Sequence, residues 1–478
     1  MRTIYAPLVL ACLVMVSSLL ALAPTAVGSA KPKQAQHQQV QPVASQPANR
    51  QPEGGITPEV ERARFDAAAD YSSKYGGRAV LVQRGGKRLF DRYDNGWSEA
   101  RPHPLASGTK SFTGVMAMMA VQDGLLTLDE RVCETLTEWK SDPRKSRVTV
   151  RELLSLSSGL ESGDGVLSSG GGSRLLGDGA RDRERRLGIE GRTKVDQPAD
   201  LAKAALGLSC VTEPGTEFRY GPSHFYVFCE LLNRKLAAKG GAITTTGAYL
   251  EQRVFKDIGI GVARIGKDRA GNPNLPGGCM LTAREWVKFG QFVLDGGSVT
   301  DADGVKRQLL RPELLAECFV PSKTNASYGL TWWLRNSAGD GAGDGAGGGH
   351  GAGIADTRGG GGGRGAQPAK DEAGNVRGSK ERATARERLM ARLRERNQEA
   401  QMGAINGPDG KPVKLYMAAG LGKQRLYVLP QFDMVVVRFA EASSEGRGFD
   451  DRTFLATVLG LTGADVNVKA PAKPAPGR

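Results

Sequence analysis

The chain has 478 residues, of which 40% are hydrophobic and 24% charged, and these proportions exclude a wholly disordered protein. Only one long apolar run occurs, which excludes a polytopic membrane protein. The net charge of +14 is compatible with binding to nucleic acid, anionic lipid or an anionic cell-wall polymer, whereas the four scattered histidines argue against a histidine-rich metal site.

The N-terminal segment, residues 1–30, is predicted to be a signal peptide or an N-terminal anchor. A positive charge at Arg2 precedes an apolar run over 4–27, and the small residues at 28–30 form a suitable cleavage site. An uncleaved anchor stays an alternative because the run is long enough to span a bilayer. The body of the protein is therefore expected to be exported, periplasmic or extracellular, with membrane contact only through this segment. Residues 31–58 are rich in Gln, Pro and Ala and are predicted to be a disordered linker.

Five cysteines remain after cleavage of the predicted signal. Export permits disulfides, the odd number leaves at least one thiol unpaired, and the spacing fits no zinc pattern. Buried free cysteines and one or two bridges are both open interpretations for Cys133, Cys210, Cys229, Cys279 and Cys318.

Strand signals lie at both ends of the remaining chain and helix signals lie between them. The patterns predict a helix over 58–75, strands over 78–83 and 88–93 about a turn at 84–87, a helix over 107–122, a capped helix opening at 149–152, a loop over 161–195, helices over 223–239 and 282–294, strands over 328–335, 425–429 and 434–439, and a final helix over 449–459. Such an order predicts an α+β fold (an α/β sandwich) in which both chain ends contribute to one antiparallel sheet.

Residues 337–410 interrupt this pattern and are predicted to be an insertion. A glycine-rich run over 339–365 lacks the strand, helix and Lys-Ser/Thr of a phosphate-binding loop. A helix over 380–400 carries many arginines, and a solvated charged helix is favoured there. Cell-wall contact through this basic insert stays possible, and no nucleic-acid partner is expected. The folded domain is predicted over 59–465, followed by a disordered tail over 466–478.

The sharpest chemical signal is Ser107-Gly108-Thr109-Lys110 at the start of a predicted helix. Residues three apart on a helix are neighbours, so Ser107 and Lys110 would share one face. A serine hydroxyl needs a base to become a nucleophile, and a lysine in a partly desolvated pocket can be that base. The helix N-terminus would also present free N–H groups to a developing oxyanion.

Two other serine mechanisms are weaker candidates. The chain has no Gly-x-Ser-x-Gly, which argues against the nucleophile elbow of the α/β-hydrolases. His103 is close to Ser107 in the sequence, but Lys110 is better placed to act as the base.

The sequence resembles the β-lactamase-related serine hydrolases of the class C type, which include class C β-lactamases, D-alanyl-D-alanine carboxypeptidases, D-amino acid amidases and carboxylesterases. The matching segments are LASGTKSFTG, VQDGLLTLDERV, TVRELLSLSSGL, PGTEFRYGPSHF, YGLTWWL and AAGLGKQRLYVLPQFDMVVV. Together they span about 78–460 without the insert. The resemblance implies an antiparallel sheet flanked by helices with a helical subdomain, in agreement with the layout above.

The resemblance also implies roles for single residues. Ser107 would be the acylated nucleophile, Lys110 its partner, and Tyr220 the general base and acid. Tyr220 opens the segment that matches the family's Tyr-x-Asn motif, and Pro222 stands there in place of the polar third residue. Proline offers no side-chain hydrogen bond, so this substrate contact would be lost or supplied by Ser223.

The family's Lys-Thr-Gly or His-x-Gly motif aligns with Ala418-Ala419-Gly420. Gly420 would line the substrate site, and the Leu421 N–H would complete an oxyanion hole with that of Ser107. Ala418 cannot hold a substrate carboxylate, and Lys423 and Arg425 are candidates for that task.

The expected activity is hydrolysis of an ester or small amide, with a D-amino acid peptide included, through an acyl-enzyme on Ser107. One alternative is a class C-like β-lactamase. Another is a non-catalytic penicillin-recognising or wall-binding module, which Pro222 and Ala418 favour. The expected partner is a small-molecule ester, amide or peptide substrate, and no cofactor or metal is implied.

Overall fold

A computed structural model describes residues 56–163, 167, 198–335, 405–441 and 448–461. The N-terminal segment, most of the linker and of the 161–195 loop, the arginine-rich helix over 380–400 and the tail lie outside the described residues. The end of the predicted insertion, 405–410, lies within them, and Ile405 there is buried.

The centre of the fold is a six-stranded antiparallel sheet with the strand order β2-β1-β11-β10-β9-β8. The pairing of β1 with β11 joins the N-terminal and C-terminal strands, as predicted. The strands are β1 (Gly77–Arg84), β2 (Lys87–Tyr93), β8 (Trp333–Arg335), β9 (Leu415–Gly420), β10 (Gln424–Leu429) and β11 (Met434–Ala440). The predicted α+β fold, an antiparallel sheet flanked by helices, is thus confirmed.

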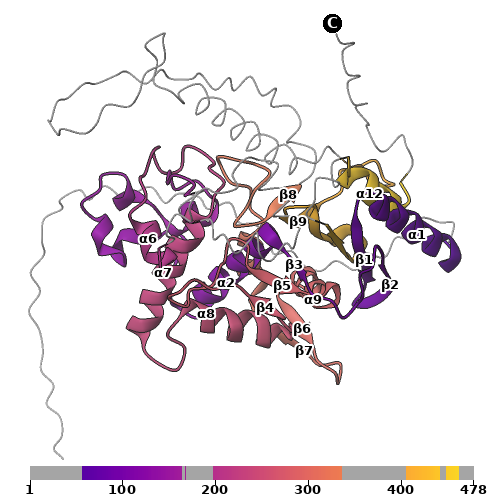
Figure 1. Cartoon of the computed structure of the whole chain (residues 1–478), viewed down its shortest axis with the longest axis horizontal. Coiled ribbons are helices and arrows are strands. Elements are labelled where there is room, and N and C mark those ends of the chain that lie inside the picture. Colours follow the sequence, from indigo (N-terminus) through magenta and orange to yellow (C-terminus); the bar gives the residue numbers. More distant parts are fainter. Residues whose placement is uncertain (1–55, 164–166, 168–197, 336–404, 442–447, 462–478) are drawn as a thin grey trace, which may run out of the picture. The chain divides into compact units, whose positions relative to one another are not determined.

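Both faces of this sheet are covered by helices, which β11 shows most clearly because successive side chains point to opposite faces. Phe439 stacks on Trp286 of α9 (Ala283–Leu294). The next side chain back, Arg438, instead donates a hydrogen bond of 2.8 Å to Ser72 Oγ of α1 (Pro58–Lys74). Two-sided burial explains the continuous apolar runs LYVL in β10 and MVVV in β11. Helix α12 (Asp451–Leu459) lies beside α1 (Figure 1).

A helical region and two small sheets complete the described structure. Helix α7 contacts α3, α6 and α8, while α2 contacts α10 and a π-helical segment over 250–256. The helices are α2 (Lys110–Gln122), α3 (Val150–Leu154), α6 (Leu201–Leu206), α7 (Ser223–Lys239), α8 (Thr246–Tyr249) and α10 (Pro312–Glu317). The remaining strands are β3 (His103–Pro104), β4 (Arg264–Ile265), β5 (Cys279–Leu281), β6 (Ser298–Thr300) and β7 (Lys306–Gln308). Short 3₁₀ turns occur at 106–109, 132–134, 137–139, 145–147 and 430–432.

Most predicted elements are confirmed, and the caps show why. Thr149 and Glu152 form a reciprocal capping box at the start of α3, which satisfies backbone N–H groups that a helix start leaves free. Thr282 caps α9 through the N–H of Glu285, and Gly240 ends α7 with a positive φ of 73°.

The predicted strand over 328–335 is wrong in its first half. Only Trp333–Arg335 forms β8, because Thr331 has φ +67° and cannot continue a strand. Contacts with α2 hold this conformation: the Gly114 N–H donates to Thr331 Oγ1 at 3.0 Å, and Ser111 Oγ donates to Thr331 O at 3.2 Å. Strand β9 was not predicted.

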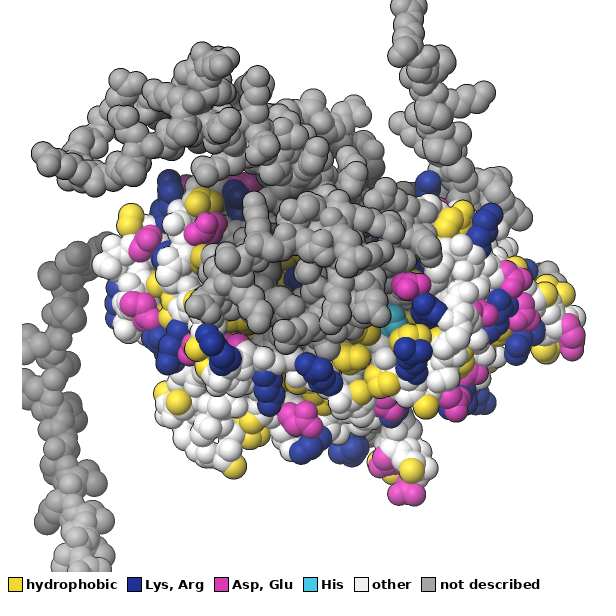
Figure 2. Space-filling view, viewed as in Figure 1, with side chains coloured by type: hydrophobic (Ala, Val, Ile, Leu, Met, Phe, Trp, Pro, Cys, Tyr) yellow, Lys and Arg dark blue, Asp and Glu magenta, His cyan; other side chains and the backbone are white. Residues whose placement is uncertain are grey.

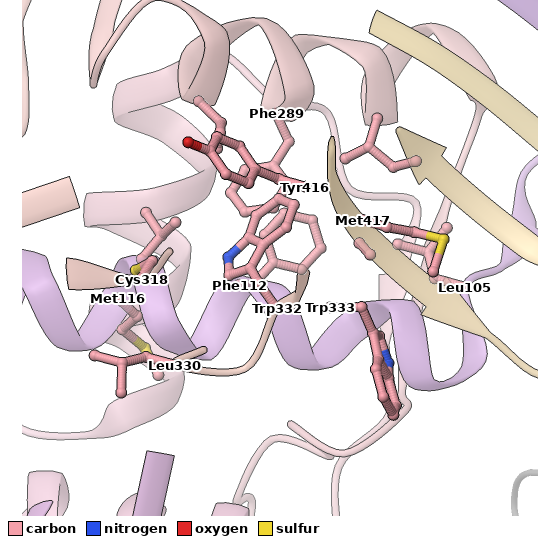
Figure 3. Close-up of a cluster of buried hydrophobic side chains, with 14 of the residues drawn as sticks. Leu105, Phe112, Met116, Phe289, Cys318, Leu330, Trp332, Trp333, Tyr416 and Met417 are labelled. Atoms are coloured by element: carbon pink, nitrogen blue, oxygen red, sulfur yellow. The ribbon is translucent and has the colours of Figure 1, made fainter. Parts of the chain in front are cut away.

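A cluster of large apolar side chains lies between α2 and β9 (Figure 3). Trp332 stacks on Phe289 and packs among the aromatic rings of this cluster. The neighbouring Trp333 points away from the cluster (Figure 3) and stacks instead on Tyr220. These two consecutive tryptophans therefore serve the core and the candidate site separately.

All five cysteines of the described chain are free thiols, which excludes the predicted alternative of bridges between them. Four are buried, and Cys210 is half-buried. Of the residues that the structure describes, none forms a helix with the length and apolar character needed to cross a membrane.

The packing of α9 on the sheet gives a stability prediction. Gly290→Ala would place a methyl group against Val435 Cγ1 and 2.8 Å from Leu426 Cδ1. Alanine gains about 1 kcal/mol of helix propensity over glycine, but overpacking a core costs about 1–3 kcal/mol. We expect a net loss of unfolding free energy, measured by urea denaturation. Gly247→Ala in α8 is the control, because its nearest neighbour is 3.7 Å away. Equal effects of the two substitutions would contradict this account.

Candidate active site

Ser107 lies in a 3₁₀ turn, Ala106–Thr109, and the α-helix begins only at Lys110. The predicted helix start at Ser107 is therefore corrected by three residues. In a 3₁₀ turn the side chains at i and i+3 eclipse each other, and the Lys110 N–H donates to the Ser107 carbonyl. This stacking brings Lys110 Nζ to 3.1 Å from Ser107 Oγ.

The Ser107 segment is held in place by β5 and α9. The Leu105 N–H donates to Cys279 O at 2.9 Å, and the Cys279 N–H donates to Thr109 Oγ1 at 3.2 Å. The ring of Trp286 lies so close to Gly108 that a Cβ there would be 2.9 Å from it. Ala106, directly before Ser107, has φ +48°. A non-glycine residue in this region is strained by roughly 1–3 kcal/mol and persists only where its surroundings determine it.

Lys110 is buried, and the residue is only 5% exposed. Its Nζ donates to the carbonyl of Pro276 at 2.6 Å as well as contacting Ser107. The ring centroids of Tyr220 and Phe225 lie 5.0 and 5.3 Å from the same nitrogen. Nothing in the sequence indicated the Pro276 carbonyl, because a backbone group has no residue signature. The Pro276 carbonyl fixes the Lys110 amine at a defined place beside the Ser107 hydroxyl.

Tyr220 reaches the site from the loop before α7. The loop is anchored by the Arg219 N–H, which donates to Leu156 O at 2.8 Å. Gly221 packs so closely on Ser162 that a Cβ would lie 2.5 Å from its carbonyl oxygen. Glycine is therefore required in the Tyr-Gly-Pro segment for packing. The Tyr220 ring stacks on Trp333 with centroids 6.0 Å apart.

A second tyrosine, Tyr328, stands edge-on to Tyr220, with ring centroids 6.5 Å apart. Burial and, to a lesser degree, its neighbour Tyr220 raise the pKa of Tyr328 well above the ordinary value. Tyr328 is therefore a neutral phenol at physiological pH and forms part of the wall around Tyr220 and Trp333.

The two residues predicted to contact substrate beside Tyr220 differ in their surroundings. Pro222 is half-buried and caps α7 without a side-chain hydrogen bond. Ser223 is fully buried, and its Oγ lies 3.3 Å from His224 Nδ1. Burial lowers the pKa of His224 to about 3, so this pair is a neutral contact within the helical region.

Gly420 ends β9 directly against the segment that carries Ser107. A Cβ on Gly420 would collide with the carbonyl oxygen of Leu105, so only glycine allows this approach. The next residue, Leu421, is thereby placed beside the Ser107 segment. The oxyanion hole formed by the N–H groups of Ser107 and Leu421 stays a prediction. This close packing explains why position 420 is a glycine.

Lys423 and Arg425 both face a buried carboxylate. Arg425 Nε lies 2.7 Å from Asp451 Oδ1, and Lys423 Nζ lies 3.4 Å from Asp451 Oδ2. Burial alone would raise the pKa of the Asp451 carboxyl, but Arg425 and Lys423 outweigh it and hold that pKa below its ordinary value. The two candidate cations for a substrate carboxylate are thus engaged in the core.

His103 lies in β3 with its ring stacked on Phe439, centroids 4.9 Å apart. Its Nδ1 donates to the carbonyl of Pro104 at 2.9 Å. Burial lowers the pKa of His103 to about 4, so the imidazole is neutral at pH 7. These contacts favour a structural role over the Ser-His alternative.

The pKa of His103 predicts a stability effect. Unfolded chains protonate histidine near pH 6.5, whereas folded His103 resists protonation until about pH 4. The stability from the neutral ring is complete above pH 6.5 and is lost as the pH falls to 4, by up to about 3 kcal/mol. We expect His103→Phe to keep the stack and to remove this loss, measured by urea unfolding at pH 7 and 4.5 against the native protein. Hydrolysis should persist, and its loss would favour the Ser-His mechanism.

Comparisons with known proteins agree with this geometry. The sequence model of the Beta-lactamase family matches residues 62–369. No curated protein sequence matches the chain. A beta-lactamase candidate from Bacteroides dorei DSM 17855 is similar in structure, with 15% identity over 83% of this chain and 97% of that one and a TM-score of 0.53.

Two further structures share the fold. EstCE1, "a hydrolase with promiscuous acyltransferase activity", is 14% identical over 85% of this chain and 99% of that one, with a TM-score of 0.50. An octameric penicillin-binding protein homologue from Pyrococcus abyssi is 14% identical over 84% and 77%, with a TM-score of 0.50. Because the family model covers most of the chain, the protein belongs to the Beta-lactamase family of serine hydrolases.

Proposed function

We propose that the protein is an exported serine hydrolase that cleaves an ester or a small amide, D-amino acid peptides included, through an acyl-enzyme on Ser107. The observation that carries the proposal is the 3.1 Å contact between Ser107 Oγ and the buried Lys110 Nζ. The ring of Tyr220 beside the same nitrogen supplies a second group able to move a proton.

The proposed reaction has two halves. Ser107 Oγ attacks the carbonyl carbon, and its proton passes to the Lys110–Tyr220 pair. The N–H groups of Ser107 and Leu421 receive the oxyanion. The tetrahedral intermediate collapses, the alcohol or amine leaves with that proton, and the acyl group stays on Ser107. Water then attacks the ester by the same route and releases the acid, which restores the serine hydroxyl.

Substrates without a carboxylate next to the scissile bond are favoured. Ala418 has no charge, and Lys423 and Arg425 both face Asp451. Pro222 likewise offers no polar side chain to a substrate beside Tyr220. A neutral ester or amide needs neither of these contacts, whereas the carboxylate of a β-lactam would find no cation at position 418.

Export and cell-wall contact are further parts of the proposal. The apolar segment over 1–30 would direct the chain out of the cytoplasm, with cleavage or anchoring as its two outcomes. Wall contact would run through the basic insert, because residues 377–400 carry eight basic and four acidic side chains. On the face drawn in Figure 2, the Lys and Arg side chains of the described residues are interspersed with Asp and Glu.

The nucleophile is tested by Ser107→Ala. We expect kcat on p-nitrophenyl acetate to fall by at least about 10⁴-fold, with labelling by a fluorophosphonate lost and Tm unchanged. Ser111→Ala is the matched control. It removes a 3.2 Å hydrogen bond to Thr331 O, which costs about 1 kcal/mol, and should keep both activity and label on Ser107. A folded, active Ser107→Ala protein would refute the mechanism.

The substrate class is tested with one β-lactam in two forms. A carboxylate left without its charged partner loses about 1.5–3 kcal/mol of binding, so benzylpenicillin should react no faster than its methyl ester. The kcat/KM for p-nitrophenyl butyrate should exceed that for benzylpenicillin by about 10-fold or more. A tenfold preference for the free acid would instead support the class C-like β-lactamase. Stable acylation by a fluorescent penicillin without turnover of any ester would support the binding module.

A further inference from the structure

Buried side chains hold the backbone carbonyl groups of Gly420 and of the turn between β9 and β10, residues 421–423. Four successive carbonyl oxygens accept hydrogen bonds from the side chains of β10 and β11 residues that are each at most 3% exposed. The contacts are Arg425 Nη1 to Gly420 O at 3.0 Å, Gln424 Nε2 to Leu421 O at 3.2 Å and to Gly422 O at 3.4 Å, and Arg438 Nη1 to Lys423 O at 2.9 Å. Lys423 adopts φ +60° within this frame, a strained conformation that the surrounding contacts maintain.

One of these contacts acts on the peptide group between Gly420 and Leu421. In a planar trans peptide the C=O and the N–H point in opposite directions, and no cis peptide occurs in the described part of the chain. Arg425 holds the Gly420 oxygen on the side of Asp451 in the core. The Leu421 N–H of the same peptide is therefore turned away from the core, while Gly420 packs on Leu105.

We propose that Arg425 is a positioning residue of the oxyanion hole, which fixes and polarises the peptide group whose Leu421 N–H receives the oxyanion. This inference rests on the proposed function and deepens it. A hydrogen bond from a charged donor to a carbonyl strengthens the N–H of that same peptide as a donor, because linked hydrogen bonds polarise one another. A fixed peptide also needs no reorganisation when charge develops on the substrate.

Asp451 determines where the guanidinium of Arg425 lies. Its Oδ1 accepts from Arg425 Nε at 2.7 Å and from the Tyr427 hydroxyl at 2.6 Å. Asp451 is the first residue of α12, so the docking of the C-terminal helix is linked to the geometry of the hole. The planar guanidinium suits this task because it can bond a carboxylate and a carbonyl at once.

The test is Arg425→Lys in the full chain, because lysine keeps the charge beside Asp451 but cannot bridge both partners. We expect kcat for p-nitrophenyl acetate to fall about 10- to 100-fold with KM changed less than about threefold. The affinity for phenylboronic acid, which forms a tetrahedral adduct with serine, should fall by the same factor, because only the tetrahedral state uses the hole. A variant within about twofold of the native protein in both quantities would overturn the proposal.

Two further variants separate positioning from folding and from charge. Asp451→Asn keeps the side-chain shape and releases Arg425, and should lower kcat and boronate affinity together, so the proposal stays testable if Arg425→Lys fails to fold. Lys423→Gln removes the other cation beside Asp451, and its side chain holds no carbonyl among the contacts above. It should leave both quantities unchanged, and a loss equal to that of Arg425→Lys would overturn the proposal.

Fluorophosphonate labelling of the native protein comes first, because it separates a failure of the proposed function from a failure of the positioning role of Arg425. An unlabelled native Ser107 would overturn the proposed function, and this inference with it. A labelled native protein whose Arg425→Lys variant keeps native kcat and boronate affinity would overturn the positioning role alone.

Discussion

The candidate site depends on one close contact between distant parts of the chain, that of Gly420 with the carbonyl of Leu105. Ser107, the proposed nucleophile, follows two residues after Leu105, and Leu421, whose N–H is the proposed second oxyanion donor, follows directly after Gly420. No residue with a side chain could occupy position 420 without moving one of these two groups away from the other. The strand β9 and the 3₁₀ turn of Ser107 are therefore placed relative to each other by backbone packing, and the side chains of Lys110 and Tyr220 are added to that frame.

The second requirement is a charged cluster inside the sandwich. Lys423 and Arg425 pair with the buried carboxylate of Asp451 on the α12 side of the sheet, and the buried Arg438 lies within electrostatic range of that carboxylate. Removing charges from water costs several kcal/mol each unless hydrogen bonds compensate. Backbone carbonyls supply this compensation, and Arg438 also lies 3.7 Å from the centroid of the Phe449 ring. Burial lowers the pKa of Arg438 to about 10, so it remains charged at neutral pH. The hydrogen bonds that stabilise these buried charges thus also hold the turn between β9 and β10 in one conformation.

Sequence reasoning predicts what is local and misses what depends on contacts. The capping box at Thr149 and the apolar run of β11 carry their own signals and were predicted. Strand β9 was missed because its sequence LYMAAG has no β-branched residue and little alternation. Thr331 was placed in a strand because no local pattern shows that α2 holds it at positive φ. Ser107 and Lys110 were predicted as neighbours from their spacing, whereas the Pro276 carbonyl and the pairing of Arg425 with Asp451 could not be, since each involves distant segments.

The predicted insertion lies in the connection between two paired strands, outside the strands themselves. About 80 residues lie between β8 and β9, although the two strands pair directly through Trp333 and Met417. Closing a loop of that length instead of a tight turn costs only about 2–3 kcal/mol, because the entropy grows with the logarithm of length. The register is set by side chains on both faces: Trp333 contacts Tyr220, and Tyr416 stacks on Phe319. A long connection at this point leaves the strand that ends at Gly420 in place, so the fold can carry the insertion without disturbing Ser107 and Leu421.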